Sequence, residues 1–226
     1  MVILAVDTTS RAGSLALARD GEVMECSAVE APDGFGQILY QEIENVLKKR
    51  GLKISDIDGY AAASGPGSFT GIRVGMTAVK ALAEVNGKQA VAVSNLLAMA
   101  EAGHGRLRAP VLDARREQVY AAVYDSELRA VVPECVIAWP DFLGLIGGHE
   151  VTFLAQSTKL FEAAGAAPLP AAGALNPHVI IAEPLAGAVA RVAARAFQRG
   201  EAAPPEAIDA NYVRKSDAEL KWRDPR

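Results

Sequence analysis

The sequence predicts an α/β protein built from two structurally similar halves, and three observations support this fold class. Short apolar runs typical of buried strands alternate with stretches of helical periodicity. A segment at 103–110, rich in Gly, Arg and Pro, has no apolar period and separates two such stretches. After it, APVLDARREQVYAAVYD at 109–125 repeats the order found at 1–20: an apolar strand ending in Asp, a polar turn and an alternating strand. We therefore expect two lobes, at 1–103 and 104–226, the second carrying a C-terminal tail.

In the first half, VILAV at 2–6 is a continuous apolar run that predicts a buried strand. The tripeptide RDG at 19–21 joins two strand-like runs, and Asp-Gly is a strong hairpin signal. Between 36 and 50 the apolar residues fall on one helical face, and Gly51 ends that helix. IDGYAAAS at 57–64 returns to a strand.

The remaining elements follow from the same periodicities. Helices are expected at 70–86, 95–102, 141–147, 157–164 and 183–199, and strands at 89–94 and 151–155. Pro168, Pro170 and Pro177 indicate a loop in the second half. The tail from 203 begins with a Pro-rich turn, and we expect it to lie across the surface.

Length and composition indicate a soluble globular protein with a hydrophobic core. The chain has 226 residues, of which 50% are apolar and 22% are charged. The net charge of −4 means that the chain has no excess of basic residues, which argues against tight independent binding of nucleic acid. No signal peptide or membrane-length apolar run stands out, so we expect a cytoplasmic protein without membrane contact. Cys26 and Cys135 form no CxxC motif, and we expect reduced, buried thiols.

The glycine-rich loop GPGSFTGIRVG at 65–75 is similar to a phosphate-binding loop. Exposed amides at the start of the following helix would attract an anion. A Walker loop needs Lys-Ser/Thr after its last Gly, where Ile72 and Arg73 stand. The dinucleotide fingerprint needs Gly in place of Thr70. We therefore favour a tight turn between strand and helix, in which the glycines allow close packing.

Gly71, Gly75 and Ala78 form a stripe of small residues along the helix that follows this loop. Such a stripe lets another backbone or helix come close. The sequence leaves two interpretations open, which are packing of the helix on its own sheet and an interface between subunits.

Asp7 and Asp113 each end a strand before a polar turn. In a two-lobed nucleotide-binding fold such carboxylates hold a metal-bound phosphate through water, and the hydroxyls of Thr8 and Thr9 would add phosphate contacts. The alternative is that each Asp caps its own turn. Both interpretations remain open at this point.

Four segments together resemble the TsaB family, also called YeaZ: ILAVDTTS, GPGSFTGIRVG, LDARREQVYAAVYD and NYVRKSDAELKW. The resemblance covers essentially the whole chain. It implies the actin-like ATPase fold, with two duplicated lobes of mixed sheet and flanking helices. It also implies a partner protein for the catalytic paralogue TsaD, assisted by the ATPase TsaE, in the transfer of threonylcarbamoyl to adenosine 37 of tRNA.

The catalytic paralogue carries a metal-binding His-x-x-x-His pair in the region that corresponds to VSNLLAMA at 93–100. Asn95 and Met99 stand where the two imidazoles would be, and neither replaces imidazole well on such a metal. The resemblance therefore implies no metal site and no catalytic residues here. The nucleotide site would be vestigial. A further departure lies at Phe35 and Gly36, where many members of the family carry His-Ser or a similar pair.

We accordingly expect a non-catalytic subunit that has no cofactor of its own, and we leave ATP or ADP open at the level of the complex. It would reach tRNA only through the complex and form a homodimer when alone. The helices at 36–50 and 70–86 would make the main contact. The expected interface residues are Ile43, Gly71, Ile72, Val74, Gly75, Met76, Ala78 and Val79. The alternatives are a stand-alone ATP-binding transferase and a peptidase, the latter without a supporting motif.

Overall fold

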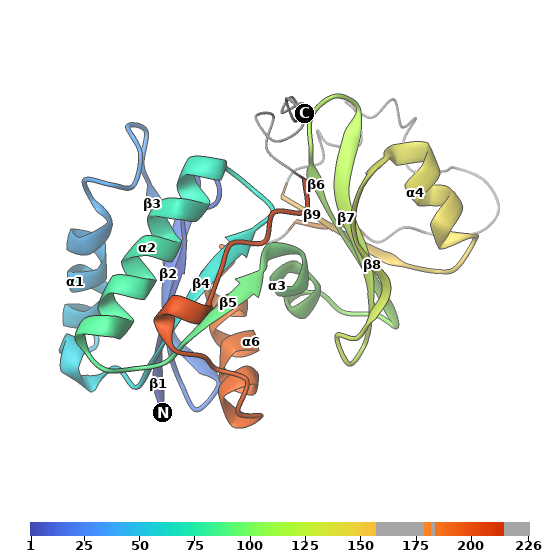
Figure 1. Ribbon diagram of the computed structural model, residues 1–226. Helices are drawn as coiled ribbons and strands as arrows, with labels where there is room; N and C mark the ends of the chain where they lie inside the picture. Colours follow the sequence, from blue (N-terminus) through green and yellow to red (C-terminus); the bar gives the residue numbers. More distant parts are fainter. Residues whose placement is uncertain (157–178, 182–183, 215–226) are drawn as a thin grey trace, which may run out of the picture.

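The computed structural model describes residues 1–156, 179–181 and 184–214 and contains two five-stranded sheets (Figure 1). The strands of the first sheet are β1 (Val2–Asp7), β2 (Ala12–Arg19), β3 (Glu22–Glu30), β4 (Gly59–Gly65) and β5 (Ala90–Ser94). Their order is β3-β2-β1-β4-β5. The hairpin β2–β3 is antiparallel and turns at Asp20 and Gly21, both with positive φ, as the Asp-Gly signal predicts.

The second sheet repeats the first. Its strands are β6 (Leu107–Asp113), β7 (Gln118–Asp125), β8 (Ala130–Ala138), β9 (Thr152–Ala155) and β10 (Val179–Ile181). Their order is β10-β9-β6-β7-β8, so β6 to β10 occupy the places of β1 to β5. In each half the first three strands are antiparallel neighbours, and the last two join in parallel. The expectation of two similar halves is confirmed.

Helices form three layers around the two sheets (Figure 1). The helices are α1 (Leu39–Lys49), α2 (Phe69–Val85), α3 (Asn95–Ala102), α4 (Trp139–Ile146) and α6 (Ala186–Gln198). α1 and α2 cover the outer face of the first sheet, and α4 packs on β7 and β8 of the second. α3 and α6 lie between the sheets, where each follows the fifth strand of its half.

Alternation along β1 explains why the first sheet carries helices on both faces. Val2, Leu4 and Val6 join the core under α1 and α2, whereas Ile3 and Ala5 join the core shared with α6. Successive side chains of a strand point to opposite faces, so a strand that is buried along its whole length needs cover on both sides. All six residues of β1 are buried.

Helix α6 is rich in small residues because it lies between two sheets. Its buried residues are Ala186, Gly187, Ala188, Val189, Ala190, Val192, Ala193, Ala194 and Ala196. All of them except Gly187 share one buried cluster with Leu112 and Tyr124 of the second sheet. Arg191 and Arg195 pair with Glu101 of α3 at 2.7 and 3.0 Å, which fixes the two inner helices to each other.

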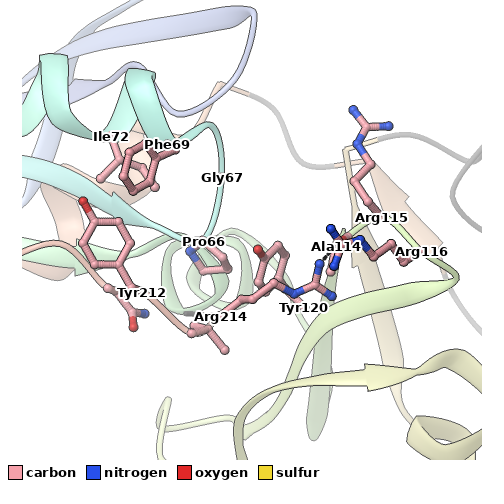
Figure 2. Close-up of a pocket in the computed structure, with 12 residues that line it drawn as sticks. Pro66, Gly67, Phe69, Ile72, Ala114, Arg115, Arg116, Tyr120, Tyr212 and Arg214 are labelled. Atoms are coloured by element: carbon pink, nitrogen blue, oxygen red, sulfur yellow. Dashed lines mark hydrogen bonds between the residues drawn. The ribbon is translucent and has the colours of Figure 1, made fainter. Parts of the chain in front are cut away.

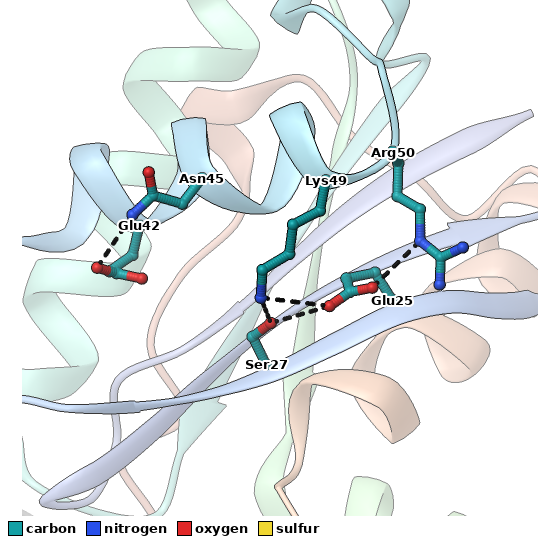
Figure 3. A network of polar contacts seen from close by, with 6 residues as sticks. All are labelled: Glu25, Ser27, Glu42, Asn45, Lys49 and Arg50. Carbon is teal, nitrogen blue, oxygen red and sulfur yellow. Dashed lines mark hydrogen bonds and ion pairs between the residues drawn. The ribbon is translucent and has the colours of Figure 1, made fainter.

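The C-terminal end of α1 is tied to the edge strand β3 by a polar network (Figure 3). Arg50 Nε donates to Glu25 at 3.1 Å, and Lys49 Nζ donates to Ser27 Oγ at 3.1 Å. These bonds hold one end of α1 on the sheet. Charged side chains along an edge strand also oppose pairing with another chain.

Two element boundaries and one missed strand are the main differences from the sequence prediction. The segment 103–110 is not a loop throughout, because β6 begins at Leu107 and its Pro lies where pairing with β7 is interrupted. The strand β10 was missed, since the surrounding prolines suggested a loop. The helix expected at 36–50 begins at Leu39, after a turn. The helix expected at 157–164, and the loop at Pro168, Pro170 and Pro177, lie outside the described residues.

The expectation of buried thiols was wrong. Cys26 is exposed and Cys135 is half-buried, although both are free, as expected. The reason is their place on β3 and β8, the edge strands of the two sheets.

The division at 103 and 104 separates the two sheets, but not the helices. α6 lies after that division in sequence, yet it packs on β1 and β2 of the first sheet. The assignment of 1–103 and 104–226 to separate lobes therefore stays a prediction, and α6 argues that neither would be stable alone.

Candidate functional site

A cleft of about 400 Å³ lies between the two lobes. Its walls are the turns that follow β1, β4 and β6, because the carboxyl ends of these strands meet at the same edge of their sheets. The lining residues are Thr9, Ser10, Arg11, Pro66, Gly67, Ser68, Asn95, Leu112, Asp113, Ala114, Arg115, Tyr120 and Gln156. Of the four residues expected to hold a nucleotide, Thr9 and Asp113 line the cleft, whereas Asp7 and Thr8 do not.

Asp7 is only 2% exposed and serves the turn that follows it. Its Oδ1 accepts hydrogen bonds from Thr9 N at 2.9 Å and from Thr9 Oγ1 at 2.6 Å. Burial raises the pKa of this carboxyl, and the hydrogen bonds from Thr9 oppose that rise. Thr8 Oγ1 donates to the carbonyl oxygen of Gly71 at 2.7 Å. The polar groups of DTTS thus have partners within the protein.

Asn95 continues this buried network into the other strand ends. Its Nδ2 donates to Thr9 Oγ1 at 2.6 Å, and its Oδ1 accepts from Gly65 N at 3.1 Å. Met99, one helical turn later, is fully buried in the apolar core between the sheets. The two positions where the resemblance places imidazoles therefore hold an amide with structural hydrogen bonds and a core thioether.

Asp113 occupies the corresponding turn of the second half, in different surroundings. Its side chain is 49% exposed, and it pairs with Arg115 at 3.0 Å while accepting from Arg115 N at 2.7 Å. Arg115, Arg116 and Glu117 all have φ between 54° and 64°, which is uncommon for residues with side chains. This turn is exposed and strained, whereas the DTTS turn is buried.

The glycine-rich loop supports close packing, as favoured from the sequence. A Cβ at Gly71 would collide with the carbonyl oxygen of Thr8, and one at Gly75 with the Thr8 hydroxyl. A Cβ at Gly67 would lie 2.7 Å from the carbonyl oxygen of Thr9. Ser68 caps α2, since its Oγ accepts from Gly71 N at 3.2 Å. The glycines therefore let α2 press against the DTTS turn.

Most residues expected at a partner interface are buried in the chain's own core. These are Ile43, Gly71, Ile72, Gly75, Met76, Ala78 and Val79, whereas Val74 is partly exposed. The physical reason is that these positions face the first sheet or pack α2 on its own turn. A groove of about 450 Å³ lies between α1 and α2, and of the expected residues only Val74 and Ala78 line it. Its other lining side chains were not predicted and include Tyr40, Phe69, Arg73 and Thr77.

A second cavity, of about 540 Å³, adjoins the cleft and was not anticipated (Figure 2). Phe69 and Tyr212 lie on one side of it, Arg115 and Arg116 lie on the other, and Arg214 reaches between them. The sequence pattern missed the tail residues because short irregular segments carry no periodicity. Their aromatic and basic side chains were the available signal.

Glu134 is another residue that the sequence analysis did not select. Its carboxylate accepts hydrogen bonds from Ser94 Oγ, from Tyr124 OH at 2.7 Å and from Asn211 Nδ2 at 2.6 Å. These donors come from the first sheet, the second sheet and the tail. An acidic residue inside the apolar run VVPECV was the signal.

In residues 1–156, 179–181 and 184–214, no helix is long and apolar enough to cross a bilayer. Within the same ranges, no three His, Cys, Asp or Glu side chains gather as metal ligands would.

Two duplicated lobes around a cleft, each with the same five-stranded mixed sheet, define a protein of the actin-like ATPase fold. The family model described as "TsaD: tRNA N6-adenosine threonylcarbamoyltransferase" matches residues 30–219. The chain therefore belongs to this family, and its relatives place it with the TsaB (YeaZ) proteins.

The relatives cover most of the chain. The "tRNA threonylcarbamoyladenosine biosynthesis protein TsaB" of Bacillus subtilis is 29% identical over 98% of both chains. The Escherichia coli protein of the same name is 34% identical over 56% of both chains. A solved structure, "YeaZ from Pseudomonas aeruginosa", is 25% identical and aligns with a TM-score of 0.74 over 93% of this chain and 99% of that one.

Proposed function

We propose that this protein acts in the synthesis of threonylcarbamoyladenosine on tRNA, as the non-catalytic subunit that supports a TsaD-type transferase. Family membership and the names of the relatives support the pathway. A TsaE-type ATPase would assist the complex, tRNA would be reached only through it, and the whole would work in the cytoplasm. ATP or ADP would enter at the level of the complex.

The observation that carries the non-catalytic assignment is the buried chain of hydrogen bonds Asp7–Thr9–Asn95–Gly65. In a nucleotide-dependent enzyme of this fold, the polar groups at these strand ends would face the ligand. Here each donates or accepts within the protein, and Asp7 and Thr8 do not line the cleft. Groups committed to internal hydrogen bonds are poorly placed to hold a phosphate or its metal.

The groove between α1 and α2 is the surface that we propose for the partner. It presents apolar and aromatic groups of Tyr40, Phe69 and Val74 beside the cation of Arg73. Aromatic residues and arginine are enriched at interface centres, where they bury large areas with one polar handle. A stable complex through this face would bury about 2,000 Å² or more. Two copies of the chain would use the same face when the partner is absent.

A modification assay tests the pathway. The purified chain, its TsaD-type paralogue and the TsaE-type ATPase are mixed with unmodified tRNA and the threonylcarbamoyl adenylate, and each protein is then omitted in turn. We expect modification to require both this chain and the paralogue. Modification by this chain without the paralogue, or ATP turnover by it that Asp113→Asn abolishes, would support the stand-alone transferase instead.

A pair of matched variants tests the surface. Tyr40 on α1 and Leu145 on α4 are each 54% exposed, and both are replaced by Arg. Tyr40→Arg places a charge in the groove and should weaken co-purification with the paralogue at least about tenfold, because a buried unpaired charge is costly. Leu145→Arg lies on the outer helix of the other lobe and should leave binding unchanged. Equal binding by both variants would refute the proposed surface. Gly75→Arg is unsuitable, since Gly75 packs against Thr8.

A further inference from the structure

We infer that residues 211–214 form a latch that holds the two lobes together across the mouth of the cleft and links the exposed face of α2 to the strained turn at 113–118. This inference goes beyond the proposed function, because it concerns the conformation of the chain alone.

The latch grips the first lobe at two points. Asn211 N donates to the carbonyl oxygen of Ser64 at 2.8 Å, at the end of β4. The ring of Tyr212 lies 5.5 Å from that of Phe69, and its hydroxyl accepts from Arg73 Nε at 3.2 Å. The guanidinium of Arg73 stacks on Phe69 at 3.7 Å, so the three side chains form one unit on α2.

Two of the latch residues, Asn211 and Arg214, also bind the second lobe. Asn211 Nδ2 donates to Glu134 of β8 at 2.6 Å. Arg214 Nη1 donates to the carbonyl oxygen of Ala114 at 2.7 Å, and its Nη2 donates to the side-chain oxygen of Gln118. Arg214 therefore spans the two ends of the turn at 113–118. A planar guanidinium with several fixed donors is suited to such a bridge.

The turn that Arg214 holds needs external support. Arg115, Arg116 and Glu117 all have positive φ, and such backbone persists only where the surroundings hold it in place. The tail and the turn face each other across the 540 Å³ cavity (Figure 2). If the lobes separated there, the bonds of Arg214 and Asn211 to the second lobe would have to break.

The latch also gives the face of α2 a mechanical link to the cleft. Phe69 and Arg73 line the groove between α1 and α2, and both contact Tyr212. Tyr212 is two residues from Arg214. A protein that moves either α2 side chain on binding would therefore shift the latch, and through it the turn at 113–118.

Hydrogen exchange of the isolated chain tests the latch. The amides of Ala114, Arg115 and Gln118 are hydrogen-bonded within the turn, so their exchange reports its opening. In Arg214→Met we expect them to exchange about fivefold faster, the factor that one ordinary hydrogen bond supports. The matched control is Arg199→Met, because Arg199 pairs only with Glu201 in the described contacts. Unchanged exchange in Arg214→Met would overturn the latch.

A second variant tests the link to α2. Tyr212→Ala removes the contact with Phe69 and Arg73 but leaves Arg214 in place. We expect the turn amides to exchange faster in this variant as well, by about twofold or more. Unchanged exchange would confine the latch to Arg214 and overturn the link.

Amides of β1 serve as the reference for global unfolding. If the β1 amides also exchange faster in Arg214→Met, the variant Gln118→Leu is measured instead. It removes one of the two acceptors of Arg214, and unchanged exchange of the turn amides in it would overturn the latch. Because no partner is present, failure here is distinct from failure of the proposed function.

Discussion

The two halves of the molecule share one strand order but treat the turn after their first strand in opposite ways. In the first half, the turn after β1 is buried, and its Asp and Thr side chains bond to each other, to Asn95 and to α2. In the second half, the turn after β6 is exposed, has positive φ at three residues and is held from outside by Arg214. The duplicated frame therefore does not dictate the site. The turn after the first strand is buried and hydrogen-bonded internally in one half. In the other half it is exposed and held by a side chain of the tail.

The sharpest way to break this comparison is Gly71→Ala. A Cβ there would collide with the carbonyl oxygen of Thr8, so α2 or the DTTS turn must move. We expect a loss of about 3 kcal/mol or more in the free energy of unfolding. The control in the second half is Gly144→Ala in α4, where nothing lies within 4 Å. It should be neutral or stabilising by up to about 1 kcal/mol. Urea denaturation measures both, and similar losses would contradict tight packing at Gly71.

Two buried tyrosines, one in each half, give the next largest effect. Tyr124 OH donates to Glu134, whereas the hydroxyl of Tyr60 has no hydrogen-bond partner among the described residues. Tyr124→Phe should lower the free energy of unfolding by about 2 kcal/mol, because a bond to a charged acceptor is lost. Tyr60→Phe should be neutral or raise it by up to about 1 kcal/mol. Equal losses on thermal denaturation would show that Tyr60 has a partner after all.

The smallest expected effect is the pH dependence of stability that the buried Asp7 of the first half causes. Burial raises the pKa of Asp7 in the folded protein above its unfolded value. Its contribution to stability is therefore present below the unfolded pKa and lost as pH rises through the folded pKa. Relative to the wild type, Asp7→Asn should gain melting temperature progressively as the pH rises above about 4, the ordinary pKa of an Asp side chain. A flat profile for Asp7→Asn would contradict the burial argument.

Much of the frame could be predicted from sequence because it follows from local signals. Apolar runs, the Asp-Gly turn and the repeat at 109–125 were enough for the first sheet and for β6, β7 and β9 of the second. The strand β10 has only three residues and stands near prolines, so it shows no period. The site was harder. Asp7 and Asp113 stand at equivalent places in the repeat, and only the fold shows that the side chain of Asp7 is buried and that of Asp113 exposed.

The predicted interface residues stay a prediction, although most of them are buried within the chain. Gly71 and Gly75 have the spacing of a docking stripe, but the same spacing also suits packing on the chain's own turn. Whether this face of α2 packs on another subunit or on the chain's own turn depends on contacts between residues that are distant in sequence. The same holds for Glu134 and Arg214, whose partners come from other elements.

The position of α6 has a consequence for how the protein is made. The inner face of the first sheet is complete in sequence at Ser94, but the helix that covers it begins only at Ala186. During translation, the apolar inner face of the first sheet therefore emerges from the ribosome long before α6 is synthesised. Nascent chains that stall after Ser94 and before α6 is made should therefore bind chaperones. The folding rate in the cell should depend on how quickly the last quarter of the mRNA is translated.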